Sequence, residues 1–407
     1  MTATLAASTA ILKRLYPTGE VPEAIQADCP GWMLIQKDSD FEGEDMAVPI
    51  VSESTVGAAA DFATAQANLG QAAYRRFLLT RVEVFSLARV TGQALRAARK
   101  NAGALVNLWE HQMKMAMKTA LKDLGVAFYG DGTAQRGTIS TVTGTTITLT
   151  TPSACVNFQV GMRIVVAATS TGALRSGSSV ISAIDRVAGT LTTASASWAA
   201  DIPLIANSDV IFRQGDAPNN SGSLYFPTGL SSWLVGGSSP GTLFGLNRTV
   251  DAVRLAGQNY NASGVQMDEA LIEGAARAHE QQEAPNLVLC HPRDYANLVK
   301  TLGGKVRYDT SDTALAKLGF RALAVDAYFG ELKIVADSFC PRNTAFLIDK
   351  GDYRFKGLDK APQILDFDSN QFLRVGNADA YECRIGTYGQ FAYVRPSSGV
   401  RITNWGL

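Results

Sequence analysis

NAGALVNLWEHQMKMAMKTALKDLGVAFYGDGT, residues 101–133, is the longest uninterrupted helical pattern in this chain of 407 residues. Asn101 can cap the start of a helix here, and Gly125 followed by the 130–132 Gly-Asp-Gly turn can end it. Apolar residues recur at steps of three and four, the spacing of an amphipathic helix. They are Val106, Trp109, Met113, Ala116, Met117, Ala120 and Leu124. The pattern predicts one long helix that divides the chain into a shorter part before it and a longer part after it.

The part before the helix predicts extended structure. Residues 1–31 predict a short arm, open to a helix at its start, that ends in a segment kept extended by Pro17, Pro22 and Pro30. Residues 32–36 and 47–51 predict two strands around an acidic link. Residues 53–73 are rich in Ala, Gly, Ser and Thr and cannot bury a core of their own, so we expect a long projecting loop that is ordered only by a neighbour. Residues 74–90 predict the return strand, and a short helix at 91–100 then leads into the long one.

The part after the helix begins with an abrupt change of composition. Residues 133–216 contain no Lys and no Glu, and Thr, Ser, Gly, Val and Ile dominate. Two similar hairpins follow each other, each with a further strand behind it. The first pairs 139–142 with 146–150 before 163–166, and the second pairs 181–184 with 189–193 before 209–212. This pattern predicts a small β-barrel or sandwich built from a duplicated unit.

A Gly-, Ser- and Pro-rich stretch at 215–241 predicts a linker out of that domain. Alternating helices and strands follow it. Pro292 stands where a helix can begin without losing a hydrogen bond, and Asp268 is the expected cap of an earlier helix. We expect helices at 247–258, 268–283 and 292–302, and strands at 286–290, 332–335, 344–348, 363–367 and 380–395. The last strand is expected to pack back on the long helix near Tyr381 to Tyr393.

Charge and cysteine content exclude several classes of protein. Lys plus Arg and Asp plus Glu number 37 each, so no global basic field exists to drive strong nucleic-acid binding. The five cysteines are scattered without paired ligand spacing, which predicts free, buried thiols. The N-terminal stretch lacks the order of a secretory signal, and no later stretch is apolar enough to span a bilayer. We therefore expect synthesis in a cytoplasm and no membrane partner.

No pattern for catalysis stands out. Cys290 and His291 are the one adjacent nucleophile and base, but neighbours on a strand point to opposite faces. The three histidines have no metal-ligand spacing, and no phosphate loop, dinucleotide fingerprint or nucleophile elbow occurs. We expect no catalytic residue, no metal and no cofactor.

Taken in order, the arm, hairpin, long helix and α/β region resemble the major capsid protein of tailed bacteriophages, with the Hong Kong 97-type fold that encapsulins share. The resemblance is carried by residues 128–133, 244–249, 286–298 and 330–348. It implies an α+β fold with an inserted all-β domain. Its parts would be an N-terminal arm (1–31), an extended hairpin loop (32–90), a peripheral domain with the spine helix (91–132), an inserted β-barrel or sandwich (133–223), an axial domain (224–367) and C-terminal peripheral strands (368–407).

The resemblance also implies a function. The chain would be a structural, non-enzymatic subunit that self-assembles into hexamers and pentamers of an icosahedral shell enclosing double-stranded DNA in a virion. Separate scaffold, portal and decoration proteins are the further partners it implies, with assembly in the host cytoplasm. Covalent cross-linking, which some members perform through a lysine on the projecting loop, is not expected because 53–73 contains no lysine.

Two sets of residues are candidates for contacts in such a shell. The acidic start of the loop would pair with arginines of another copy. These residues are Phe41, Glu42, Glu44 and Asp45 on one side and Arg75, Arg76 and Arg99 on the other. Lys114, Lys118 and Lys122 share one face of the long helix with His111, although like charges at this spacing repel. A solvated face explains the stripe, and the alternative is a face that contacts phosphates of packaged DNA in the lumen.

Three rival functions remain open at this point. An encapsulin-like compartment would share the fold and package enzyme cargo. A cysteine hydrolase would use Cys290 and His291. A surface adhesin would be built on the Thr-rich domain, which the missing export signal argues against.

Overall fold

The computed structural model describes residues 29–93, 108–217, 226–302, 307–309, 322–327, 330–366 and 371–407. The predicted arm before residue 29, the body of the predicted 91–100 helix with Arg99, and the Asn101 cap lie outside these residues. The chain forms two compact units. The larger contains Asp28–Val84, Ala120–Gln363 and Gly386–Leu407, and the smaller contains Phe85–Thr119 and Ile364–Ile385.

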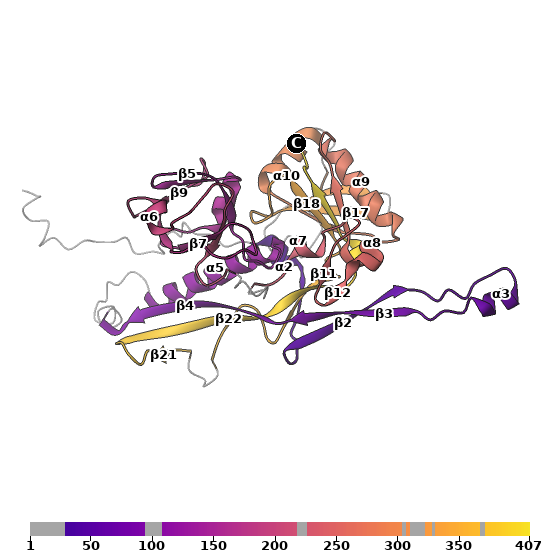
Figure 1. Cartoon of the computed structure of the whole chain (residues 1–407), viewed down its shortest axis with the longest axis horizontal. Helices are drawn as coiled ribbons and strands as arrows, with labels where there is room; N and C mark the ends of the chain where they lie inside the picture. The colour runs from indigo at the N-terminus through magenta and orange to yellow at the C-terminus, as the bar shows by residue number, and fades with distance from the viewer. Residues whose placement is uncertain are drawn as a thin grey trace, which may run out of the picture. The chain divides into compact units, whose positions relative to one another are not determined.

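Figure 1 follows the elements in chain order. The helices are α2 (Pro30–Leu34), α3 (Phe62–Ala67), α5 (Leu108–Tyr129), α6 (Trp198–Asp201), α7 (Leu230–Trp233), α8 (Ala252–Ala256), α9 (Met267–Glu280) and α10 (Pro292–Leu302), with 3-10 turns η1 (Pro152–Asn157), η2 (Arg248–Asp251) and η4 (Pro396–Ser398). The strands up to the barrel are β1 (Gln36–Asp38), β2 (Asp45–Glu53), β3 (Ala73–Thr80), β4 (Val82–Thr91), β5 (Gly137–Thr143), β6 (Thr146–Leu149), β7 (Arg163–Ala167), β8 (Ser179–Asp185), β9 (Thr190–Thr193) and β10 (Val210–Arg213). The later strands are β11 (Thr242–Leu243), β12 (Leu246–Asn247), β13 (Gln258–Asn261), β14 (Leu287–Cys290), β15 (Arg307–Asp309), β16 (Ala322–Ala327), β17 (Gly330–Ala336), β18 (Thr344–Ile348), β19 (Tyr353–Gly357), β20 (Gln363–Ile364), β21 (Leu373–Arg374), β22 (Ala380–Tyr393) and β23 (Val400–Thr403).

The long helix predicted from the sequence is α5, but Gly125 does not end it. The helix runs through Gly125, and packing accounts for the glycine: a Cβ there would lie 2.7 Å from Cδ2 of Phe339, so only glycine leaves room for that ring. The end comes at Tyr129. Gly132 then adopts a φ of +89°, and Asp131 Oδ1 accepts a hydrogen bond of 3.0 Å from the amide of Thr133.

The last turn of α5 lies in an aromatic core. The ring of Phe128 lies 5.1 Å from that of Tyr353 and 5.7 Å from that of Phe391. The hydroxyl of Tyr353 donates a 3.2 Å hydrogen bond to the carbonyl of Phe128. Because Phe391 belongs to β22, the expected packing of the helix on the C-terminal strand is confirmed for this turn.

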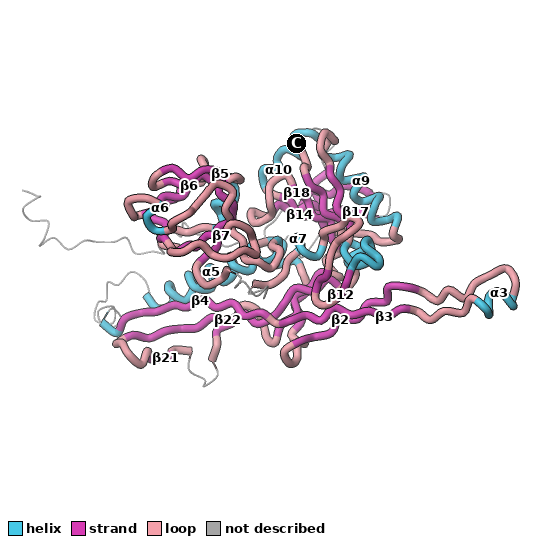
Figure 2. Tube along the Cα trace, viewed as in Figure 1, coloured by secondary structure: helices cyan, strands magenta, loops and turns pink. Residues whose placement is uncertain are grey.

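A seven-stranded mixed sheet forms the second core of the larger unit. Its order is β13-β23-β18-β14-β17-β16-β15. Alternate residues of β14 serve two cores: Val288 and Cys290 pack with α9 and α10, whereas Leu287 and Leu289 join the aromatic core. A strand buried on both faces reads as a continuous apolar run, which is why this strand was visible in the sequence. Figure 2 labels β14 close to β17 and β18, its partners in this sheet.

Residues 137–213 form a closed six-stranded barrel of order β10-β5-β6-β9-β8-β7. Its two halves repeat each other in detail. Ile139 donates to Asp209 and accepts from Ser208, and Ile181 donates to Met162 and accepts from Gly161, all at 2.8–3.0 Å. Each hairpin also carries a bulge one residue after its Ile. The predicted duplication is therefore confirmed, and closure leaves no free strand edge.

Several sequence predictions near the ends of elements were wrong. The strand expected at 32–36 starts only at Gln36, because Pro30 opens the short helix α2 and Trp32 packs edge-on against Phe355 at 5.0 Å. The return strand breaks at Arg81 into β3 and β4. Asp268 lies inside the first turn of α9, whose cap position is Gln266.

The predicted linker is also wrong over its described part. Residues 226–234 contribute Phe226, Leu230, Trp233 and Leu234 to the aromatic core. Gly- and Ser-rich composition reflects close packing here, since a Cβ at Gly229 would lie 2.1 Å from the carbonyl oxygen of Ala127. The strand expected at 363–367 is shorter, since β20 contains only Gln363 and Ile364.

The smaller unit contains paired strands and the first described part of α5. β22 pairs with β4 and β21. Side chains along β4 alternate strictly between buried and exposed. Ser86 Oγ donates to the carbonyl of Ala116 at 3.0 Å, which joins this strand to the helix.

Candidate assembly surface

The β2–β3 hairpin has two different faces. One face packs on the subunit's own core through Val48, Phe77 and Leu79. The opposite face, which we call the outer face, pairs Val51 with Tyr74 across the strands, and these side chains are 60% and 77% exposed. The outer face consists of Ala47, Pro49, Val51, Tyr74, Arg76 and Leu78. An exposed strip of mainly apolar residues, here interrupted by Arg76, is typical of a protein–protein interface.

The far end of the hairpin has its own local order (Figure 1). Asp61 caps α3, because its Oδ2 accepts from the amide and the hydroxyl of Thr64 at 3.0 and 3.1 Å. These hydrogen bonds, the amide first, lower the pKa of Asp61. A Cβ at Gly70 would lie 2.8 Å from Val56, so the two arms of the loop touch below the helix. The loop thus has hydrogen bonds and contacts of its own, and its ordering by a neighbour stays a prediction.

This tip buries none of its apolar helix residues. No residue of α3 is buried, and Phe62, Leu69 and Val56 are 81%, 77% and 69% exposed. Large apolar side chains held in a fixed, exposed arrangement are suited to insertion into a partner's surface.

The acidic turn between β1 and β2 matches its prediction only in part. Glu42, Glu44 and Asp45 are exposed. Phe41 instead lies in the core of its own chain at 3% exposure, and its amide donates to Gly357 at 3.1 Å. Because its side chain is used inside the subunit, Phe41 is removed from the candidate contacts.

The predicted arginines behave differently from one another. Arg75 Nη2 lies 3.2 Å from Glu53 Oε1, and its Nε donates to Ser52 Oγ at 3.0 Å. It therefore stiffens its own hairpin. Arg76 is exposed on the outer face. Pairing of these residues with another copy stays a prediction.

The lysine stripe of α5 stays a prediction as well. Lys114 is exposed, while Lys118 and Lys122 are half-buried. Their helical spacing places them on one face of α5, as expected.

Cys290 and His291 do not form a nucleophile–base pair. The Cys290 thiol donates to the carbonyl of Val335 at 3.9 Å, and burial raises its pKa far above the usual range. His291 Nδ1 accepts from the amide of Arg293 at 3.1 Å, so the imidazole caps α10. Burial, with Arg342 and Arg293 nearby, lowers the pKa of His291 to about 4. A protonated thiol beside a weakly basic imidazole is the opposite of an activated cysteine.

Other expected features concern the described residues alone. Within them, no three His, Cys, Asp or Glu side chains are grouped so that they could hold a metal ion. All five cysteines are free and buried, as predicted. No helix in the described ranges is both long and apolar enough to cross a membrane.

Sequence reasoning missed two features. The outer face was readable in principle, because 45–53 and 73–80 alternate with apolar residues on both faces rather than on one. A ring of four charged residues at the root of the barrel was not readable, since its members are up to 93 residues apart: Asp123, Arg136, Arg213 and Asp216.

Comparison with known proteins identifies the family to which this chain belongs and the known structures that its fold is similar to. A family model described as the SU10 major capsid protein matches residues 86–370. The fold is similar to the cyanophage A-1(L) capsid asymmetric unit, with a TM-score of 0.59 and 9% identity over 100% of both chains. It is also similar to the capsid of a native GTA particle, with a TM-score of 0.52 and 7% identity over 99% of this chain and 98% of the other. No curated protein matches the chain.

The family match spans more than half of the chain, and the similar structures cover almost all of it. The α+β architecture of this chain is thus a phage capsid fold. This chain belongs to the SU10 major capsid protein family and is a structural protein of the capsid.

Proposed function

We propose that this capsid protein is the repeating subunit of a closed icosahedral shell, built from hexamers and pentamers of itself, that encloses double-stranded DNA in a virion. The observation that carries the proposal is the exposed outer face of the β2–β3 hairpin, where apolar residues flank Arg76, together with the exposed apolar side chains of the tip. In this role the hairpin lies on a neighbouring copy, and the chain has no catalytic function.

Apolar burial, rather than ion pairing, supplies most of the contact in this proposal. Exposed ion pairs such as those open to Glu42, Glu44 and Arg76 contribute about 0–1 kcal/mol each. Burying apolar surface contributes about 25 cal/mol per Å². The charged residues would therefore set the register between copies, while Val51, Tyr74 and Phe62 would hold them together.

Removing the distal loop tests this role directly. Glu53 and Ala73 are Cα partners across the hairpin, so an Asn-Gly turn can replace residues 54–72 without breaking the ladder. We expect soluble subunits that form no closed particles in negative-stain microscopy. Intact shells from this variant would refute the proposed role of the hairpin.

A matched control changes exposed apolar residues elsewhere. Val160 and Val187 in the barrel are 64% and 85% exposed. V160S/V187S should assemble as the parent does. Loss of particles in this control as well would show that assembly responds to exposed apolar residues in general.

The contents of the particles separate the virion from its rival. Purified shells should contain double-stranded DNA, whereas shells filled with an enzyme would support an encapsulin-like compartment.

K114Q/K118Q/K122Q tests whether the lysine face of α5 looks onto DNA. Reduced genome mass per particle would support that orientation, and an unchanged mass would remove it.

Scaffold, portal and decoration proteins and assembly in a host cytoplasm complete the proposal. They are implied by the resemblance to tailed-phage capsids. Co-purification of shells from infected cells, followed by mass spectrometry, would identify such partners.

A further inference from the structure

Four charged side chains close a ring at the root of the barrel. Arg136 Nη2 lies 2.7 Å from Asp123 Oδ1 and 3.1 Å from Asp216 Oδ2. Arg213 Nη1 lies 2.7 Å from Asp123 Oδ2, and its Nε lies 2.8 Å from Asp216 Oδ2. Each carboxylate therefore contacts both arginines, and each arginine contacts both carboxylates.

The ring joins the barrel to the long helix. Asp123 lies on α5, Arg136 precedes the first barrel strand, and Arg213 ends the last one. The two arginines thus stand where the chain enters and leaves the barrel, and one helical carboxylate holds both. The Asp123 and Arg136 side chains are each only 2% exposed, which keeps water from competing for these contacts.

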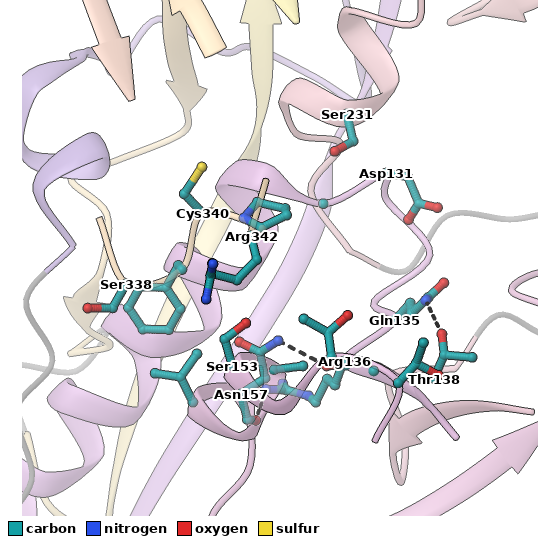
Figure 3. Close-up of a pocket in the computed structure, with 18 of the residues that line it drawn as sticks. Asp131, Gln135, Arg136, Thr138, Ser153, Asn157, Ser231, Ser338, Cys340 and Arg342 are labelled. Atoms are coloured by element: carbon teal, nitrogen blue, oxygen red, sulfur yellow. Dashed lines mark hydrogen bonds between the residues drawn. The ribbon is translucent and has the colours of Figure 1, made fainter. Parts of the chain in front are cut away.

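The barrel is otherwise a separate body. Its interior forms a core of its own, which includes Phe158, Trp198 and Ile211. Val156 packs against the aromatic core of the subunit. A cleft of about 590 Å³ separates the base of the barrel from the loop between β17 and β18. Figure 3 shows Arg136, Thr138 and Asn157 on the barrel side of this cleft, with Ser338, Cys340 and Arg342 opposite.

We propose that this ring is an orientation lock: it fixes the barrel to α5 so that the two move as one body. The cleft beside Arg136 leaves part of the barrel base without packing against the loop between β17 and β18, so without the ring the barrel pivots on the two segments that join it to the chain. Asp123 is the central residue, because its loss leaves two arginines facing each other across a single carboxylate. This lock is independent of how the subunit assembles.

Spin-label distance measurements on the full chain test the lock. The native cysteines are buried, so V187C on the barrel and I272C on α9 introduce two exposed labelling sites. Labelled chains are diluted with unlabelled chains if particles form. We expect one narrow distance distribution in the parent and a distribution at least twice as wide in D123N and in R213Q.

The barrel supplies a matched control. Arg175 and Asp209 form an internal ion pair of 2.6 Å, with side chains 21% and 3% exposed. The Arg213–Asp123 pair is 21% and 2% exposed. R175Q removes an equally buried pair that does not reach α5, so its distribution should stay narrow.

Each outcome decides the proposal. Narrow distributions in both ring variants overturn it, and so does equal broadening in R175Q, which would assign the motion to the barrel interior. If D123N lacks the near-ultraviolet spectrum of the folded parent, R213Q decides alone, because Arg213 is partly exposed and its loss leaves Arg136 to both carboxylates.

Discussion

Single buried polar residues act as joints between distant segments of this subunit. Asp337 accepts from the amide of Gly31 at 3.0 Å, the hydroxyl of Tyr129 at 2.9 Å and the amide of Phe339 at 2.9 Å. It thereby connects α2, the end of α5 and the loop after β17. Burial raises the pKa of this carboxyl, and the same hydrogen bonds oppose that rise. Asp337 has a structural role, because its carboxylate accepts these hydrogen bonds from groups of the fold itself.

His291 should make the subunit sensitive to acid. Its pKa in the fold is about 4, below the usual 6.5, so between these values the unfolded chain takes up a proton that the folded chain does not. Stability should therefore fall as pH drops from 6.5 to 4, by at most about 3 kcal/mol. Denaturant midpoints of unassembled subunits across this range would measure the slope. H291N keeps a capping side chain and cannot titrate, so it should flatten the slope; an unchanged slope would contradict this assignment.

Gly229 should tolerate no side chain. A Cβ there would lie 2.1 Å from the carbonyl oxygen of Ala127 and 2.4 Å from that of Phe128, both in the last turn of α5. These are backbone atoms that cannot rotate away, so G229A should lower stability by at least about 2 kcal/mol. Thermal unfolding of soluble protein would measure the loss. G376A is the control, since nothing lies within 4 Å of its added Cβ, and an equal loss there would exclude the close approach as the cause.

At the scale of elements, buried and exposed side chains alternate along β2 and β3, so the two faces of the hairpin have different roles. One face joins the core of its own subunit, and the other is left apolar and exposed. Successive side chains of a strand point to opposite faces. In this hairpin, one set of alternate residues therefore serves folding, and the other set is available for assembly. Arg75 is the exception, since it serves its own hairpin through Glu53.

Substitutions on the two faces should have opposite effects. V51S/Y74S removes exposed apolar groups, so subunit stability should change by less than about 0.5 kcal/mol while the concentration needed for particles rises several-fold. V48S, on the inner face at 6% exposure, should instead destabilise the subunit by about 2 kcal/mol. Light scattering against concentration and thermal unfolding would separate the two. Normal assembly of V51S/Y74S would rule out the outer face as a contact.

At the scale of the whole molecule, a barrel of two similar halves stands between α5 and the seven-stranded sheet along the chain of a capsid fold. The barrel satisfies its own strand edges and encloses its own core, and the helix and sheet around it form their own cores. Such a barrel requires little from the rest of the fold beyond a fixed attachment. The charged ring at Asp123 supplies that attachment.

The excised barrel, residues 134–217, should therefore fold alone. Arg136 and Arg213 keep Asp216 as a partner when Asp123 is removed. We expect a β-rich circular dichroism spectrum and one cooperative thermal transition. A random-coil spectrum would show that the barrel depends on α5 for folding and not only for orientation.

The sequence by itself determined the elements that rest on local patterns. Helical spacing predicted α5, repeated hairpins predicted the duplicated barrel, and a doubly buried run predicted β14. Their order along the chain was sufficient to indicate a capsid fold. Each of these patterns lies within a short stretch, where period and turn residues decide the backbone.

Tertiary structure decided the features that depend on residues far apart in sequence. The ring of Phe339 occupies the space beside Gly125 within the helix, and Phe41 packs into the core of its own chain while its amide donates to Gly357. The ring around Asp123 exists because folding brings the two ends of the barrel onto one helix. No local sequence pattern predicts these long-range contacts. The free energy that favours them comes from burial and ion pairing between segments that are neighbours only in the folded chain.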